Sequence, residues 1–233
     1  MKTTTESRVE LLNVMGDDLT VVEAARVSFD KSSDWEHYVD QYDALKVKLS
    51  EKDEKLINYL AKHNHWTPFA HCQAQFRITA PIFVARQLVK HQVGLVWNEV
   101  SRRYVDDEPV FYIPKLRARP DKSIKQGSGG EYKGERPFGV LVDLPFYMED
   151  LLKLSLDLYT DMIAKGVAPE QARMVLPQNT MTTWWWTGSL TAFHRVCKLR
   201  LDPHAQLETR EVAEQIKGLL EPVFPVSWKA LNG

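Results

Sequence analysis

The sequence predicts an α+β fold in one domain, residues 1–233, with helices mixed with a mainly antiparallel sheet. Two observations support this prediction. Segments whose apolar residues recur at helical spacing are interleaved with segments that alternate polar and apolar residues. This order lacks the regular strand and helix alternation of a parallel sheet, and the Gly-x-Gly-x-x-Gly motif of a Rossmann fold does not occur.

The composition is that of a soluble globular protein. The chain has 30 Lys and Arg against 31 Asp and Glu, so its overall charge does not favour nucleic-acid binding. At 233 residues it buries roughly 70% of its unfolded surface, which removes any need for a structural metal or disulfide. No apolar run approaches the roughly 18 residues of a membrane span, and the first residues do not resemble a secretion signal. With only two cysteines, we expect a cytoplasmic protein without metal or membrane contact.

Local signals place two helices near the start of the chain. Asp17 or Asp18 is a suitable cap for a helix that reaches Arg26. Ser50 followed by Asp53 is a capping-box pattern, and apolar residues then recur at helical spacing.

A strand and a third helix follow. Residues 73–80 alternate polar and apolar side chains, as on a half-buried strand. Pro81 suits the first position of a helix that we expect to continue to His91. On that helix, Gln87, Lys90 and His91 would share a face.

The second half begins with a short strand, 111–113, and a surface loop at about 117–136. The glycines within this loop also allow a phosphate-binding interpretation, although no strand leads into them. A long amphipathic helix from Pro145 should stop at Gly166, and a short helix should open at Pro169. The tryptophan-rich segment 180–187 is expected to be extended, and the last two helices to be capped by Ser189 and Asp202.

Three polar clusters could carry chemistry. The segment 63–72 holds three histidines and a cysteine, but its spacing is not that of a zinc site, and His63 suits the end of a helix. In the second cluster, Glu99, Ser101 and Arg103 alternate and would face one way on an extended segment, suiting an anionic ligand. The third cluster combines Arg173 with the basic run 195–210. Solvated surfaces are the alternative for the last two clusters.

Together the clusters resemble the flavin-dependent thymidylate synthases over nearly the whole chain. The stretches that carry the resemblance are Ala25–Phe29, His65–Phe69, Ala80–Gln87, Lys90–Gln92, Asn98–Tyr104, Ala172–Pro177 and Leu199–Gln206. Two features depart from the family pattern. Its Arg-His-Arg is Lys90-His91-Gln92 here, and the following stretch is one residue longer and lacks the expected serine. Lysine loses the planar donor fork of arginine, and glutamine loses the charge.

The resemblance implies reductive methylation of dUMP to dTMP, with methylenetetrahydrofolate as carbon donor, FAD as redox cofactor and NADPH as reductant. It also implies a homotetramer with active sites built from several subunits. Arg200 is the expected catalytic residue, because a fixed cation beside the uracil would stabilise developing negative charge. Two alternatives stay open: a variant pyrimidine nucleotide methylase or hydroxymethylase, and a non-catalytic nucleotide-binding homologue.

The resemblance also assigns binding residues. Those expected around dUMP are Gln87, Lys90, Glu99, Ser101, Arg103, Arg173 and Arg200. Those expected to bind FAD are Ser28, Thr67, Lys90, His91, Gln92, Glu99, Ser189 and Arg195, with His65 near the flavin and folate. Ser101 has no neighbouring base in the sequence and is assigned to nucleotide binding rather than to nucleophilic catalysis.

Overall fold

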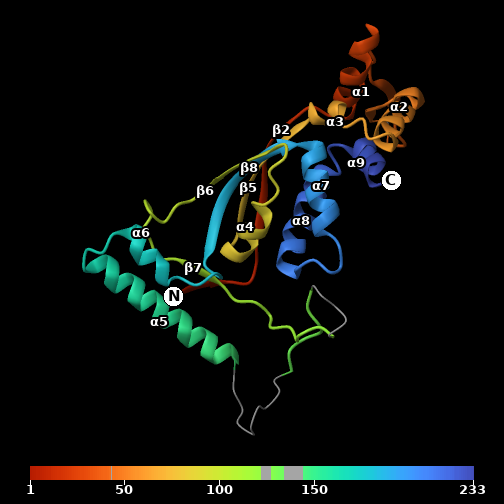
Figure 1. Ribbon diagram of the computed structural model, residues 1–233. Coiled ribbons are helices and arrows are strands. Elements are labelled where there is room, and N and C mark those ends of the chain that lie inside the picture. Colours follow the sequence, from red (N-terminus) through yellow and green to blue (C-terminus); the bar gives the residue numbers. More distant parts are fainter. Residues whose placement is uncertain (43, 122–126, 134–143) are drawn as a thin grey trace.

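An antiparallel sheet forms the centre of the molecule (Figure 1). The computed structural model describes residues 1–42, 44–121, 127–133 and 144–233. Within this part of the chain the main sheet has four strands, in the order β2 (Arg8–Met15), β5 (Gln73–Pro81), β8 (Met181–Ser189) and β6 (Leu95–Glu99). All of its neighbouring strands are antiparallel. The α+β prediction with a mainly antiparallel sheet is confirmed.

Two smaller strand pairs accompany the main sheet. β1 (Lys2–Thr4) pairs in parallel with β7 (Val110–Tyr112), and β3 (Glu36–Val39) pairs with β4 (Leu45–Lys48) as an antiparallel hairpin. Both strand pairs lie outside the four-stranded sheet.

Side-chain alternation gives the sheet one buried and one open face. On β5 and β8, Phe76 opposes Trp186 and Ile78 opposes Trp184, and all four are fully buried. On the other face Arg77 opposes Trp185, which is 49% exposed. The buried tryptophans supply much of the apolar area that stabilises the sheet.

Three helices cover the buried face, namely α4 (Ile82–Leu88), α7 (Leu190–Arg200) and α8 (Leu207–Leu220) (Figure 1). Phe193 on α7 makes edge contacts with Phe76 and Trp186, with ring centroids 4.9 and 5.3 Å away. These contacts fix the start of α7 against the middle of the sheet, where several candidate residues lie.

A helical group lies at one end of the sheet (Figure 1). It contains α1 (Asp18–Arg26), the 3₁₀ turn η1 (Val27–Phe29), α2 (Glu51–Lys62), α3 (Thr67–Ala70) and α9 (Pro225–Asn232). The buried carboxylate of Asp18 accepts hydrogen bonds from the backbone of Val226 and Ser227, both at 2.8 Å, and so caps α9. Burial raises the pKa of this carboxyl group.

A second helical group lies near the opposite end of the sheet (Figure 1). It consists of α5 (Leu144–Ala164), α6 (Pro169–Ala172) and the 3₁₀ turn η3 (Arg173–Val175). Gly166 follows α5 with φ of +82°, the left-handed conformation expected at a helix end. No helix in the described ranges is long and apolar enough to cross a membrane.

Several local predictions are confirmed. Asp17 caps α1 in a capping box, Ser50 caps α2, and Ser189 caps α7 by accepting from the backbone of Ala192. His63 follows the last turn of α2 as its C-cap, as its position in the sequence indicated.

Other predictions were wrong. Pro81 ends β5 and is the N-cap of α4, one position before the helix begins, instead of its first residue. α4 stops at Leu88, so Lys90 and His91 do not share its face with Gln87. Asp202 does not cap the next helix, which has Gln206 at that position. The loop at about 117–136 is described only in part, because 122–126 and 134–143 lie outside the described residues.

Candidate functional site

A tight turn joins the end of α4 to the start of β6. The backbone nitrogen of Leu95 donates to the carbonyl of Gln92 at 3.2 Å, and Gly94 has φ of +77°. The carbonyl of Gly94 accepts from the backbone of Ser189 at 3.2 Å. A Cβ atom at Gly94 would approach Ala192 Cβ to 3.2 Å and Ser189 Oγ to 3.3 Å. The stretch between His91 and Asn98 therefore begins with a glycine turn that packs on the first turn of α7.

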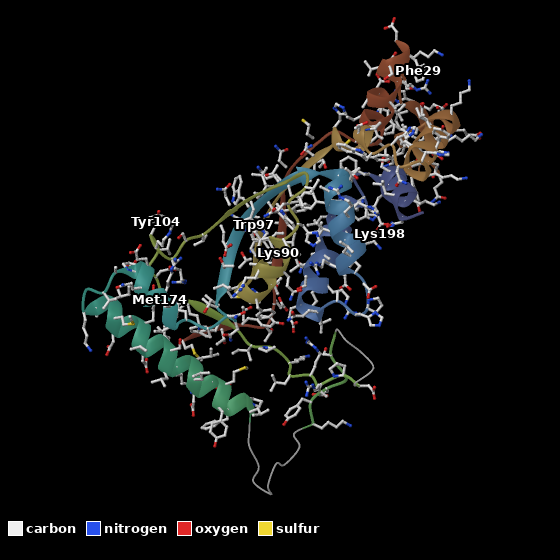
Figure 2. The ribbon with its side chains drawn as sticks, in the orientation of Figure 1. Phe29, Lys90, Trp97, Tyr104, Met174 and Lys198 are labelled. Carbon is white, nitrogen blue, oxygen red and sulfur yellow. The ribbon has the colours of Figure 1, made fainter. Side chains whose placement is uncertain are left out.

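Two arginines of α7 reach this turn. Arg200 Nε donates to His91 Nε2 at 3.0 Å, and Arg195 Nη2 donates to the carbonyl of Val93 at 2.8 Å. Burial, and then the positive charges of Arg200 and Arg195, lower the pKa of His91. The imidazole is therefore neutral at pH 7, and its Nε2 is the acceptor. Lys90 lies beside the same turn (Figure 2).

Gln87 lies on α4 and is held by residues at the start of α8. Its Nε2 donates to Gln206 Oε1, and its Oε1 accepts from Thr209 Oγ1 at 3.2 Å. Gln206 in turn donates to the buried carboxylate of Glu208 at 3.0 Å. Sequence reasoning selected Gln87 and included Gln206 in the third cluster, but it did not predict that the two residues are hydrogen-bonded.

Glu99 lies at the end of the edge strand β6. It accepts from Thr182 Oγ1 at 2.8 Å and from the indole nitrogen of Trp97 at 3.2 Å. Trp97 stacks on Trp184 with a centroid separation of 4.4 Å. These contacts hold the Glu99 carboxylate in place beside the sheet.

The segment after Glu99 is not extended as expected. β6 ends at Glu99, and residues 102–104 form a turn. Ser101 and Arg103 still meet, because Arg103 Nε donates to Ser101 Oγ at 3.1 Å. The guanidinium of Arg103 also lies over the exposed ring of Tyr104, 5.0 Å from its centroid. The two residues present one hydroxyl and one cation at the surface.

A cavity of about 980 Å³ opens beside these strand ends. Glu99 and Arg173 line it, and so do Arg8 and Arg102, which sequence reasoning did not select. The side chain of Arg102 is 17% exposed, and its Nη1 donates to the carbonyl of Asp107 at 2.9 Å. The adjacent pair Arg102 and Arg103 was visible in the sequence. Because the segment was assumed to be extended, Arg103 was selected as the residue facing the ligand, and Arg102 was not.

Three expected cofactor residues lie apart, in the helical group at the end of the sheet. Ser28 is in η1, Thr67 opens α3, and His65 makes an edge contact with the ring of Tyr59, 5.9 Å between centroids. Phe29, beside Ser28, is 74% exposed (Figure 2). The described residues include no cluster of three or more His, Cys, Asp or Glu side chains that could hold a metal ion.

The Ser28 segment is held by a buried carboxylate. Asp53 accepts from Arg26 Nε at 3.1 Å, from Ser33 Oγ at 3.0 Å and from Ser50 Oγ at 2.8 Å. These hydrogen bonds overcome the effect of burial and lower the pKa of Asp53. The residues on both sides of η1 are therefore attached to α2.

One chain thus brings the candidate residues together only in part. The segment after α4 contacts α7 along its length, through Arg200, Arg195 and Ser189, and Gln87 on α4 contacts the start of α8. The cavity is lined by Arg173 but by neither Arg103 nor Arg200, so the three guanidinium groups do not share it within one chain.

Comparisons with known proteins cover nearly the whole chain. The family model described as "Thymidylate synthase complementing protein" matches residues 10–226. A Kosmotoga olearia protein named flavin-dependent thymidylate synthase is 34% identical over 226 residues, which are 95% of this chain and 88% of that protein. A Thermus thermophilus protein of the same name is 35% identical over 224 residues, 96% of this chain and 75% of its own length.

Solved structures show the same fold. A UMP/dUMP methylase, PolB from Streptomyces cacaoi, bound with 5-Br dUMP, has a TM-score of 0.82 and 27% identity, covering 100% of this chain and 97% of that one. A second structure of that methylase, bound with 5-Br UMP, has a TM-score of 0.81 and 26% identity, covering 99% and 96% of the two chains.

Proposed function

The chain belongs to the family described as thymidylate synthase complementing protein, and from this premise we propose that it is an enzyme that methylates dUMP to dTMP. Methylenetetrahydrofolate would supply the carbon and NADPH the reducing equivalents. The observation that carries the proposal is the contact between His91 and Arg200, which joins two motifs 109 positions apart. The contact brings together the Lys90–Gln92 and Leu199–Gln206 stretches, both of which carry the resemblance.

Arg200 is the proposed catalytic residue. Its Nε donates to His91, which fixes the guanidinium, and among the described residues its terminal nitrogens have no hydrogen-bond partner and would face the substrate. A cation held in this way costs no reorganisation when negative charge develops on the pyrimidine ring. The neutral His91 contributes by accepting from Arg200 without adding a second charge.

The other nucleotide contacts are proposed for Gln87, Lys90, Glu99, Ser101, Arg103 and Arg173. Arginine forks suit a phosphate, so Arg103 and Arg173 are assigned to it. Arg173 supports this assignment because its Nε donates to the backbone carbonyl of Glu170 at 3.3 Å, a contact that leaves the positive charge of the guanidinium available for an anion.

The chemistry of the turn after α4 fits a flavin dinucleotide. Arg195 brings positive charge to the turn of residues 92–95, which packs on the first turn of α7, where backbone dipoles also favour an anion such as a diphosphate. Lys90 precedes this turn in the sequence. Further hydrogen-bonding groups would come from Gln92, Ser189 and Glu99. The distant helical group would contribute Ser28, Thr67 and His65. FAD, when bound, would carry the reducing electrons.

We propose that these two groups of residues complete each other between chains of a homotetramer. Support comes from the single chain, in which Ser28 and Thr67 lie in a different part of the fold from Arg195 and His91. The exposed side chains of Phe29 and Trp66, beside Ser28 and Thr67, are apolar surface that an assembly would cover. Such a protein would work in the cytoplasm, where its nucleotide and folate substrates occur.

A visible absorbance spectrum tests the proposal. We expect the purified protein to be yellow or to bind added FAD saturably, and to bleach when NADPH and dUMP are supplied. Mass analysis of the nucleotide then identifies the product, because methyl and hydroxymethyl groups differ by one oxygen. A protein that binds dUMP without turnover would support the non-catalytic alternative.

A broader substrate range is a second candidate function. It is favoured by the similar methylase that has been solved with 5-Br UMP as well as with 5-Br dUMP. Parallel assays with UMP and dUMP test it: product from both would establish the broader range, and product from dUMP alone would exclude it.

A further inference from the structure

The carboxamide of Gln87 is held in one orientation by two residues of the α8 start. Its Nε2 donates to Gln206 Oε1, and its Oε1 accepts from Thr209 Oγ1 at 3.2 Å. A carboxamide has two donor hydrogens and two acceptor sites, so one of each remains for a ligand. The contacts with Gln206 and Thr209 therefore determine where the remaining donor hydrogen and the remaining acceptor site of Gln87 point.

The orientation of Gln206 depends in turn on Glu208. Gln206 Nε2 donates to Glu208 Oε2 at 3.0 Å. An ionised carboxylate only accepts hydrogen bonds, so Gln206 must turn its nitrogen toward Glu208 and its oxygen toward Gln87. The Gln206 oxygen can only accept a hydrogen bond, so Gln87 must turn its Nε2 toward it as the donor. One carboxylate therefore sets the direction of two carboxamides.

Arg117 holds this carboxylate from another segment. Glu208 is 2% exposed, and Arg117 Nη2 lies 2.8 and 2.9 Å from its two oxygens. Arg117 Nε also donates to Ser128 Oγ at 2.6 Å. A buried carboxylate without a cation would be costly, so Arg117 is part of the arrangement. We call Gln87, Gln206, Glu208 and Arg117 the carboxamide network.

We propose that Glu208 is a positioning residue that fixes the Gln87 carboxamide through Gln206, and that this orientation favours a uracil over a cytosine nucleotide. The inference rests on the proposed function, in which Gln87 contacts the nucleotide. Uracil has a hydrogen-bond donor at N3 and an acceptor oxygen at C4. Cytosine has an acceptor at N3 and a donor amino group at C4. A rotated carboxamide exchanges its own donor and acceptor, so the fixed orientation matches only one of the two bases.

Glu208→Gln tests the proposal. The new carboxamide can donate as well as accept, which allows Gln206 and Gln87 to rotate. Glu214→Gln is the matched control, because it makes the same charge change on α8 at an exposed residue outside the carboxamide network. Titration calorimetry of the full chain with dUMP and with dCMP measures the preference. We expect the ratio of the two dissociation constants to fall about tenfold in the first variant, the effect of one hydrogen bond, and to stay at the wild-type value in the control.

An unchanged ratio in Glu208→Gln, or an equal loss of both nucleotides, would overturn the inference. A second measurement does not depend on nucleotide binding. In ligand-free protein labelled with ¹⁵N-glutamine, Glu208→Gln should move the side-chain signals of Gln87 and Gln206, and Glu214→Gln should leave them in place. A wild-type protein that binds no dUMP contradicts the proposed function, while unmoved signals overturn the network itself.

Discussion

Arg200 donates a hydrogen bond from Nε to Nε2 of His91 at 3.0 Å, although 109 positions separate them in the sequence. The contact gives each residue a defined state. His91 is neutral with its proton on Nδ1, and Arg200 is held at its Nε, while the described part of the chain gives its terminal nitrogens no hydrogen bond. The residue proposed for catalysis is thus positioned by a residue proposed for flavin binding.

Loss of the Arg200 side chain should affect turnover more than binding. In Arg200→Ala the cation that stabilises charge on the pyrimidine ring is removed, and we expect kcat to fall by about 10²- to 10³-fold while FAD stays bound. Steady-state kinetics and flavin absorbance measure the two effects. Lys198→Ala is the control, because it removes a cation from the same helix (Figure 2). Unchanged turnover in Arg200→Ala would remove this residue from the mechanism.

The lowered pKa of His91 predicts a loss of stability on mild acidification. Its ordinary value is 6.5, and burial and two arginines lower it in the folded state. Between the lowered value and about 6.5 the unfolded chain binds more protons, so the free energy of unfolding falls as pH falls through this window, by at most about 1.4 kcal/mol per pH unit per histidine. Above 6.5 the contribution of His91 is complete. The pKa of His194 is lowered in the same direction by burial.

Urea unfolding of flavin-free protein at several pH values between 5 and 8 measures this slope. We expect a shallower slope in His91→Gln and the shallowest in His91→Gln/His194→Gln. His37→Gln changes an exposed residue of β3 and should keep the wild-type slope. A double variant with the wild-type slope would show that other groups cause the pH dependence.

The parts of the fold that were predictable are those set by local chemistry. Asp17, Ser50 and Ser189 cap helices because their side chains bond to backbone groups only a few residues away. The alternation within 73–80 identified β5 because it reflects one buried face. Such signals do not depend on the rest of the fold.

The parts that were missed depend on distant contacts. No local breaker separates Leu88 from His91, and α4 ends there because the following turn packs on Ser189. Arg102 lines the cavity because a turn, not a strand, follows Glu99. The arginines and histidines of the candidate site could be selected from the sequence. The pairing of Gln87 with the start of α8 could not, because it results from the packing of α4 against α8.

The family pattern has an arginine where this chain has Gln92. We predict that Arg195 supplies the positive charge that this position has lost. Its guanidinium reaches the turn of residues 92–95 from α7. Arg195→Gln should weaken FAD binding about tenfold, the usual effect of losing a hydrogen bond to a charged group. Adding Gln92→Arg to this variant should restore much of the affinity. Fluorescence titration with FAD measures both, and Lys198→Gln is the control. No rescue by Gln92→Arg would show that Arg195 supports only the turn.

Gly188 should be intolerant of a side chain, because it is paired with Leu95 at the start of β6 and the neighbouring turn lies close to it. A Cβ atom there would lie 2.4 Å from Leu95 Cδ2 and 2.5 Å from the carbonyl oxygen of Gly94. Since the carbonyl belongs to the backbone of the glycine turn, it cannot move without displacing that turn from Ser189. We expect Gly188→Ala to lower the free energy of unfolding by about 1–3 kcal/mol, the usual cost of overpacking, and to weaken FAD binding.

Gly218→Ala provides the matched comparison for this prediction. Gly218 lies within α8, and a Cβ atom there would meet nothing within 4 Å. Alanine is the better helix former, so this variant should keep or raise stability, by up to about 1 kcal/mol. Urea unfolding curves and FAD titrations of the two variants decide the matter. Equal stability of both would mean that β6 can move away from β8, and the turn would then not be a fixed part of the site.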